Sequence, residues 1–401
     1  MTKACYRLEM LASKTLRLTA CRARFFLAVA LLCGAVMPAY ALESVLSFTD
    51  PTAAAGDAIA ISAHLHYFTG NDPLAMREYQ GNWQGAYRPR SGRNLGLLSQ
   101  RADVALQAAG WRVGAFQRQE MLIDSSRETV DLIHFHKTRT QAPAGQSFVV
   151  DVSYQAFNAT GWRVDKAWQW HIADEKEFTF GIGYSMLEGH RVRTGAYNGF
   201  MSSLGAGNYN YALGFNDADT RKTYPFQTPG QPEGHGQSWD IGVSLKNRDG
   251  LRFDFLANDL LANIRWHDIP ATIANANTGV TTTDADGYIV YAPALSGRNF
   301  RHDFTQKLPP RYAVAAELPW RDFTLFGSLA RQQNINFPLA GATWAFANKW
   351  RLQADYDFRF GSTGLKLTSP IAFIALRMSQ LNLSEASAYG LSVGLNRELH
   401  E

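Results

Sequence analysis

The segment Trp350–Phe360 reads Trp-Arg-Leu-Gln-Ala-Asp-Tyr-Asp-Phe-Arg-Phe, and it decides the fold. From Trp350 onward every even-numbered position is apolar, and every odd-numbered position between is polar or charged. A period of two over this length predicts an extended strand with two unlike faces. A strand of a soluble sandwich can alternate in the same way. Charges fill most of one face here and aromatic rings fill much of the other, which is typical of a membrane-barrel strand of about ten residues with lipid outside and water inside.

The first forty-one residues have the make-up of a secretory signal peptide. A basic region precedes an apolar core at Phe25–Met37, and Ala39-Tyr40-Ala41 supplies a small-x-small cleavage site. The apolar core is too short to span a membrane comfortably, which weighs against a retained anchor. We therefore expect residues 1–41 to be removed and residues 42–401 to form one domain. The sequence leaves open whether translation starts at Met1 or at Met10.

Composition excludes several kinds of protein once the signal is removed. All three cysteines, Cys5, Cys21 and Cys33, lie inside the signal, so a disulfide scaffold, a thiol enzyme and a cysteine metal site are excluded for the mature chain. The mature chain keeps 33 basic and 34 acidic residues. A net charge near zero gives no reason to expect a nucleic-acid partner. No apolar run reaches the length of a membrane helix, so no helical anchor is expected.

Short hairpins with a shared detail recur along the chain. Each predicted turn is followed by a large apolar residue, usually Trp, and then by an Arg on the other face. The four copies are Trp111-Arg112-Val113 after 108–110, Trp162-Arg163-Val164 after 158–161, Leu251-Arg252-Phe253 after 247–250 and Trp350-Arg351-Leu352 after 347–349. Trp320 begins a looser copy. Trp prefers the boundary between lipid and water, so Trp111, Trp162, Trp320 and Trp350 are candidates for an aromatic girdle. The alternative is a set of sandwich hairpins whose Trp side chains pack a core.

The connections between the hairpins are longer and more polar, at about 124–146, 216–237 and 268–310. Short turns at one end and long loops at the other are typical of an outer-membrane barrel, and we count about sixteen strands, within a range of 14–18. The chain thus resembles the porin-like outer-membrane β-barrels as a class. That resemblance implies an all-β, single antiparallel up-and-down barrel in the outer membrane of a Gram-negative bacterium, with membrane lipid as its partner.

The polar face of each strand predicts the residues that line the lumen. These candidates are Arg112, Arg163, Arg252, Asp254, Arg351, Gln353, Asp355, Asp357 and Arg359. Facing rows of Arg and Asp can pass hydrated solutes, so we predict a channel or export barrel for hydrophilic solutes, with charged saccharides or polysaccharide as one class. The same rows can instead form a wall of ion pairs. A non-transporting barrel, serving as an anchor, an adhesin or an accessory to secretion or polymer assembly, is therefore the alternative.

The sequence gives little evidence for a catalytic site or a metal site. His64 and His66 lie two residues apart, as do His134 and His136, but two histidines fall short of a closed metal site. Ser238 lies near His235 in the sequence, yet no motif joins them into a hydrolase site. We expect no enzymatic activity, no cofactor and no metal. The sequence gives neither the solute nor the oligomeric state.

Overall fold

The computed structural model describes residues 44–79, 81–172, 176–224, 230, 232–279, 281–283, 289–291, 294–346 and 350–398. The expected signal peptide at 1–41 and the expected turn at 347–349 lie outside these residues. Among the described residues, no helix is both long and apolar enough to cross a bilayer.

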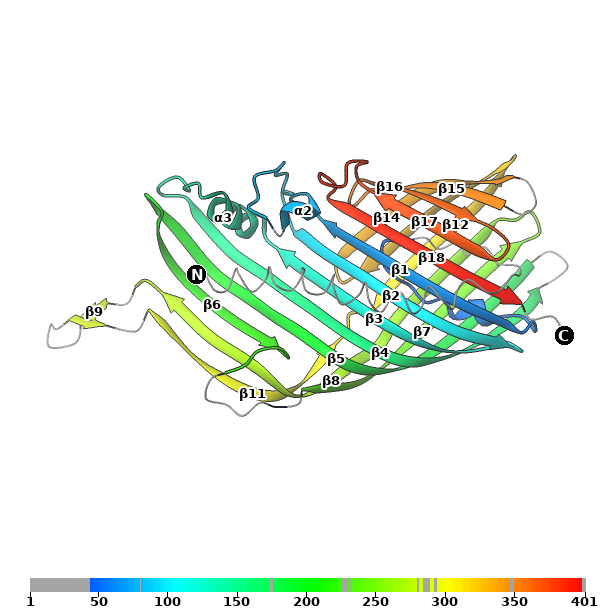
Figure 1. Cartoon of the computed structure of the whole chain (residues 1–401), viewed down its shortest axis with the longest axis horizontal. Helices are drawn as coiled ribbons and strands as arrows, with labels where there is room; N and C mark the ends of the chain where they lie inside the picture. The colour runs from blue at the N-terminus through cyan, green and yellow to red at the C-terminus, as the bar shows by residue number, and fades with distance from the viewer. Residues whose placement is uncertain are drawn as a thin grey trace.

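The described residues form an antiparallel β-barrel of tilted strands with three helical segments (Figure 1). The first seven strands are β1 (Ala60–Asn71), β2 (Asn94–Ala108), β3 (Trp111–Ser125), β4 (Ser147–Ile172), β5 (Lys176–Gly205), β6 (Asn208–Asp219) and β7 (Glu233–Asn247). The next are β8 (Arg252–Asn277), β9 (Thr281–Thr283), β10 (Ile289–Tyr291), β11 (Leu295–Lys307), β12 (Arg311–Trp320) and β13 (Phe323–Gln332). The last are β14 (Ile335–Phe346), β15 (Trp350–Asp357), β16 (Ser362–Thr368), β17 (Ala372–Met378) and β18 (Ala388–Glu398). The helical segments are η1 (Pro51–Ala54), α2 (Met76–Tyr79) and α3 (Arg127–Thr138).

A 16-stranded sheet builds the wall, and fourteen of its strands close the barrel through pairing of β1 with β18. The two additional strands are β6 and β11. The long strand β5 pairs with β7 over its first half and with β6 over its second half. Likewise β8 pairs with β12 near its start and with β11 further along. The wall formed by β4, β5, β6, β8 and β11 is therefore much taller than the wall formed by β13–β17, and we call it the tall wall.

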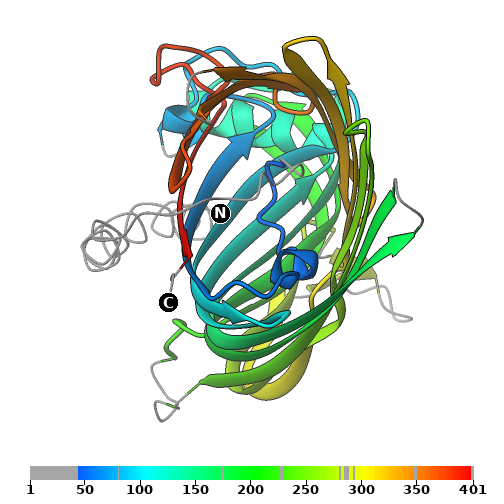
Figure 2. The same ribbon diagram turned by 90° about the vertical axis from the view of Figure 1, so that its right-hand side faces the viewer.

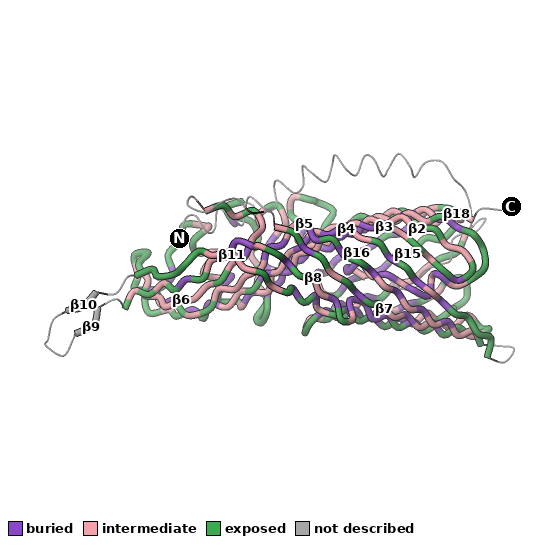
Figure 3. Tube along the Cα trace, turned by 90° about the horizontal axis from the view of Figure 1, so that it is seen from below, coloured by how far each residue is buried: buried purple, intermediate pink, exposed green. Residues whose placement is uncertain are grey.

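The alternation of the opening segment is present in the structure. Trp350, Leu352 and Tyr356 are exposed on the outer face of β15, whereas Asp355 and Asp357 are buried on its inner face. Phe360 differs, because β15 ends at Asp357 and the following loop turns this ring into the interior. Buried and less buried positions alternate along most strands (Figure 3).

Three details of the predicted topology are wrong. The segment 268–310, expected to be a connection, contains the last part of β8 and all of β11, because polar residues here lie on strands that extend the wall. The expected turn at 158–161 does not exist, because β4 runs unbroken from Ser147 to Ile172. The neighbouring strand absorbs the irregularity with a register shift opposite Asn158 and Ala159. The segment 124–146, expected to be a loop, contains α3, whose N-cap Ser126 accepts a hydrogen bond from the Thr129 amide. Small polar residues mark turns and helix starts alike, so the sequence signal was ambiguous.

The outer face carries a belt of exposed apolar side chains, as expected for a wall that faces lipid. Members of this belt include Val314, Leu318, Leu325, Leu365, Ile374 and Leu376. A closed barrel satisfies every backbone group of its wall without water, so it is the β-structure that can span a membrane.

The depth of this belt is testable within one strand. Val314 and Leu318 both point outward on β12, and Leu318 lies two residues from the strand end at Trp320. We expect Val314→Arg to lower the free energy of unfolding by about 2–4 kcal/mol, because it places a charge near the bilayer midplane. Leu318→Arg should cost only about 0–1 kcal/mol near the interface. Denaturant unfolding in lipid vesicles measures both, and equal costs would contradict the assignment of this face to lipid.

Candidate functional site

The lumen contains the chain's own N-terminal segment. Residues Ser44–Ala55, which precede β1, lie inside the barrel and include the single helical turn η1 (Figure 2). Val45, Leu46, Ser47 and Thr49 are buried. We call Ser44–Ala55 the plug. No regular hydrophobic period marks it in the sequence, so it is not among the elements that the sequence predicts.

Hydrogen bonds fasten the plug to both sides of the lumen. The Ser47 amide donates to Oγ of Ser99 on β2 at 3.0 Å. The Thr49 amide donates to Oδ1 of Asn258 on β8 at 2.8 Å, and Asn258 Nδ2 donates back to the Thr49 carbonyl at 2.8 Å. Asn258 is fully buried, so this reciprocal pair satisfies an amide group that would otherwise be costly to bury.

Two glycines make room for η1. A Cβ on Gly181 of β5 would lie 2.5 Å from the Pro51 carbonyl carbon. A Cβ on Gly242 of β7 would lie 2.9 Å from Thr52 Cγ2. Asp50 caps this turn by accepting hydrogen bonds from the amide and the hydroxyl of Thr52. The inner wall is thus shaped to receive the plug.

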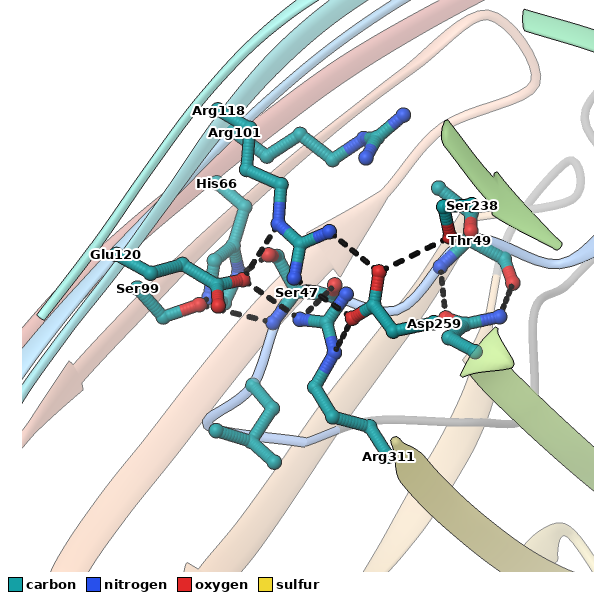
Figure 4. Close-up of polar contacts among 12 residues, drawn as sticks. Ser47, Thr49, His66, Ser99, Arg101, Arg118, Glu120, Ser238, Asp259 and Arg311 are labelled. Carbon is teal, nitrogen blue, oxygen red and sulfur yellow. Dashed lines mark hydrogen bonds and ion pairs between the residues drawn. The ribbon is translucent and has the colours of Figure 1, made fainter. Parts of the chain in front are cut away.

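An ion-pair cluster crosses the lumen beside the plug, and Figure 4 shows its members. Arg118 of β3 binds Asp259 of β8 through two hydrogen bonds of 2.6 and 2.7 Å. Arg311 of β12 contacts Asp259 at 2.8 Å and Glu120 at 2.9 Å, and it donates to the Ser47 carbonyl at 3.0 Å. Arg118, Asp259 and Arg311 are each at most 3 % exposed. We call Arg118, Glu120, Asp259 and Arg311 the central cluster; it ties three strands and the plug together.

Asp259 reaches this position through an irregularity in β8. Its backbone φ is 61°, in the left-handed region that Asp tolerates better than most residues. The register between β7 and β8 shifts around Trp239, opposite this stretch. The bulge turns consecutive residues Asn258 and Asp259 both toward the lumen, where one holds the plug and the other holds two arginines.

A second charged group lies on the side of η1. Arg163 on β4 contacts Asp165 at 2.6 Å and also pairs with Asp240 of β7. Arg112 on β3 contacts Asp165 at 2.8 Å and donates to the Asp50 carbonyl at 2.9 Å. The Thr49 hydroxyl donates to Asp240 at 3.0 Å. Opposite charges are therefore paired across the lumen instead of facing open water.

The predicted lumen residues fall into two groups. Arg112 and Arg163 meet at Asp165 beside the plug, Arg252 pairs with its neighbour Asp254, and Gln353 donates to Asp355. The other three lie at the two ends of β15: Arg351 is exposed near its start, Asp357 caps the loop after it, and Arg359 lies in that loop and pairs with Asp72. Arg101, Glu120, Asp259 and Arg311 were not among the candidates, although Glu120 follows Arg118 at the same two-residue spacing.

The predicted girdle residues are placed as follows. Trp111, Trp320 and Trp350 are exposed at strand ends next to short connections. Trp162 is exposed on the outer wall too, but it pairs with Ala115 well inside β4.

The two histidine pairs lie in different parts of the structure. No group of three metal-binding side chains occurs in the described parts of the chain. His66 Nδ1 lies 3.1 Å from Ser392 Oγ of β18, and its Nε2 lies 3.3 Å from the Val45 carbonyl of the plug. His134 stacks on Tyr87 with ring centroids 3.9 Å apart, outside the barrel strands. Partial burial in this stack holds the pKa of His134 below its usual value.

Apolar side chains line much of the remaining inner wall. One cluster lies mainly on the tall wall and includes Phe157, Val192, Trp266 and Ile269 there and Phe116 of the neighbouring β3, with Phe300 and Phe304 packed against it. We call it the tall-wall cluster. A second cluster surrounds Val45 and Leu46 of the plug and includes Phe68, Phe337 and Phe360. An aqueous porin has a polar inner face, so this lumen differs from that arrangement.

No family model and no curated protein matches the chain. Among solved structures, the Pseudomonas putida toluene transporter TodX is 11 % identical over 89 % of this chain and 94 % of that chain, with a TM-score of 0.43. A Pseudomonas aeruginosa FadL homologue is 12 % identical over 88 % and 93 %, with a TM-score of 0.42. The translocator domain of the Neisseria meningitidis autotransporter NalP is 10 % identical over 86 % and 90 %, with a TM-score of 0.25. At these values the likeness concerns the barrel fold alone. Its closed antiparallel wall and apolar outer belt give the chain the architecture of a membrane-spanning β-barrel.

Proposed function

We propose that the protein is a gated outer-membrane channel, closed by the plug, that admits a small apolar or amphipathic molecule. One observation carries the choice of solute: exposed apolar side chains lie on the inner face of the tall wall, among polar ones, between its free end and the tall-wall cluster. Val149 and Phe200 are paired across β4 and β5 and are 59 % and 56 % exposed. Phe200 lies eight residues from Val192 on the same strand, and therefore on the same face.

A further exposed apolar side chain lies on the same inner face, on β8. Ile273 of β8 is 44 % exposed and lies two residues beyond Ala271, a member of the tall-wall cluster. Val149 and Phe200 adjoin each other, and exposed apolar side chains that do so on a concave wall are costly in water and mark binding sites. Apolar molecules would gain by leaving water here, whereas a hydrophilic solute would gain nothing from these residues.

A hydrophilic solute is the second candidate, and the charged groups beside the plug favour it. Once the plug moves, Arg101, Arg112 and Asp240 would border a wet passage. The paired charges are also compatible with a barrel that never conducts. An anchoring or accessory role is therefore the alternative that the experiment must exclude. The proposal contains no catalytic step.

Entry of two probes into cells that produce the protein tests the solute class. We expect faster uptake of N-phenylnaphthylamine, an apolar fluorescent dye, and no faster uptake of a labelled disaccharide. The double variant Phe200→Gln, Ile273→Gln should slow dye uptake several-fold. Met186→Gln serves as the matched control, because this side chain is 60 % exposed but lies on the outer face of β5. Faster disaccharide uptake alone would favour the hydrophilic candidate, and no uptake of either probe would favour the anchoring role.

A further inference from the structure

The connection between β1 and β2 carries a run of basic residues that the transport proposal does not use. Residues 87–94 read Tyr-Arg-Pro-Arg-Ser-Gly-Arg-Asn, with three arginines and no acid. This connection lies at the end of the barrel that carries the long loops. It is therefore on the extracellular side in an outer-membrane barrel.

A fourth arginine joins the run from a distant part of the sequence. Arg359, in the loop after β15, and Arg90 both pair with Asp72, which Arg90 Nε contacts at 3.1 Å. Arg90 also donates to the Arg359 carbonyl. The Asp72 side chain is only 1 % exposed and additionally accepts the Leu95 amide at 2.8 Å. Asp72 is thus an internal strut that holds two guanidinium groups side by side.

Positive charge exceeds negative charge at this place. Arg93 has its own carboxylates, Asp124 and Asp151. Arg88 is exposed and has no ion-pair partner among the described residues. Arg90 and Arg359 share the carboxylate of Asp72, and Asp357 also attracts Arg359. Arg88 adds a third positive charge to these two carboxylates. Arg359 Nε is buried without a hydrogen-bond acceptor in the described structure, so one guanidinium donor remains unused.

Hydrogen bonds hold the backbone of this connection in place before any ligand binds. Asn94, which is 2 % exposed, accepts from the Arg90 amide at 2.8 Å and donates to the Arg90 carbonyl at 3.1 Å and to the Gly92 carbonyl at 3.2 Å. The Arg88 amide donates to the Pro73 carbonyl at 2.8 Å. A loop that is held before binding loses less conformational entropy when a ligand arrives.

We propose that Arg88, Arg90 and Arg359 form an extracellular binding site for a phosphate group. Guanidinium groups present paired N–H donors that match phosphate oxygens, and two adjacent arginines can share one phosphate. Either of two sources can supply this group: a phosphorylated glycolipid of the outer leaflet or a soluble phosphorylated solute.

Titration of the purified full-length protein in neutral detergent separates the two sources. The lipid probe is a bisphosphorylated acylated glucosamine disaccharide (lipid A), compared with the same lipid after dephosphorylation. The soluble probe is glucose 6-phosphate. The test variant is Arg88→Gln, Arg90→Gln. The matched control is Arg77→Gln, which removes an exposed arginine of α2 from the same connection. Arg359 stays unchanged, so the strut with Asp72 remains.

We expect the double variant to bind the phosphorylated lipid about tenfold more weakly, and Arg77→Gln to bind it as the wild type does. Wild-type binding should also weaken as salt rises, because Arg88 and Arg90 are exposed. Binding of glucose 6-phosphate that the double variant loses would support the site with a soluble source. Equal binding of every phosphorylated probe by wild type and double variant would overturn the proposal. The thermal unfolding midpoint of each variant shows whether it is folded, and none of these measurements depends on transport.

Discussion

Deleting residues 44–55 is expected to convert a closed barrel into a conducting one. The plug fills the lumen between β2 and β8, and its Ser47 and Thr49 amides are bonded to those opposite walls. The wall keeps its own strand pairings without the plug, so the barrel should still assemble. Single-protein recordings in planar bilayers should show rare, small openings for the wild type and a sustained conductance at least about tenfold larger for the deletion, because hydrated ions cross a wide lumen freely.

A point substitution tests the same gate without shortening the chain. Gly181→Val places a side chain where Pro51 now lies, since even a Cβ would be 2.5 Å from the Pro51 carbonyl carbon. Gly327→Val on β13 is the control, because the nearest atom to its added Cβ is 3.9 Å away. We expect Gly181→Val to conduct and Gly327→Val to behave as the wild type. A deletion variant that assembles and stays closed would show that the wall itself closes the lumen.

Asp259→Asn is expected to cause the largest loss of stability among single substitutions in the lumen. It leaves Arg118 and Arg311 buried with one carboxylate fewer, and removing one partner of a buried ion pair costs about 3–5 kcal/mol. Asn keeps the size of Asp and also tolerates the left-handed backbone of this position, so the change isolates the charge.

The midpoint of guanidinium unfolding in lipid vesicles measures this effect. Asp303→Asn is the control: this carboxylate pairs with His267 at 2.8 Å, and both side chains are about two-thirds exposed. Exposed pairs contribute little, so its midpoint should stay at the wild-type value. Equal midpoints for both variants and the wild type would mean that water enters the central cluster freely.

The sequence predicts the strands of the barrel wall better than the plug and the ion pairs inside the lumen. Alternation at Trp350–Asp357 identifies both faces of β15, because lipid and lumen select different side chains at every second position. The turn expected at 158–161 fails, since Asn and Gly are tolerated inside a long strand whose neighbour carries the bulge. The tandem placement of β6 and β7 beside β5 depends on pairings between distant residues, which no local pattern records.

The candidate site was less predictable for a similar reason. Arg112 and Arg163 were identified because they stand on the polar face of regular strands, and both contact Asp165. Asp259 could not be identified in this way, because it lies in a bulge where the alternation of inward and outward side chains breaks. The plug has no repeating pattern, and its buried position is fixed by Asn258 and Arg311, which lie more than 200 residues away along the chain.

His66 links two steps in the assembly of this protein, the closure of the barrel and the placement of the plug. One ring nitrogen contacts Ser392 on the last strand, and the other contacts the Val45 carbonyl near the start of the described chain. The seam between β1 and β18 can seal only after the whole chain has been synthesised, whereas Val45 is among the first residues to emerge. Because a single imidazole serves both contacts, sealing the seam and seating the segment that blocks the interior reinforce each other. The barrel is therefore expected to complete its insertion already shut, which would protect the cell from leakage during biogenesis.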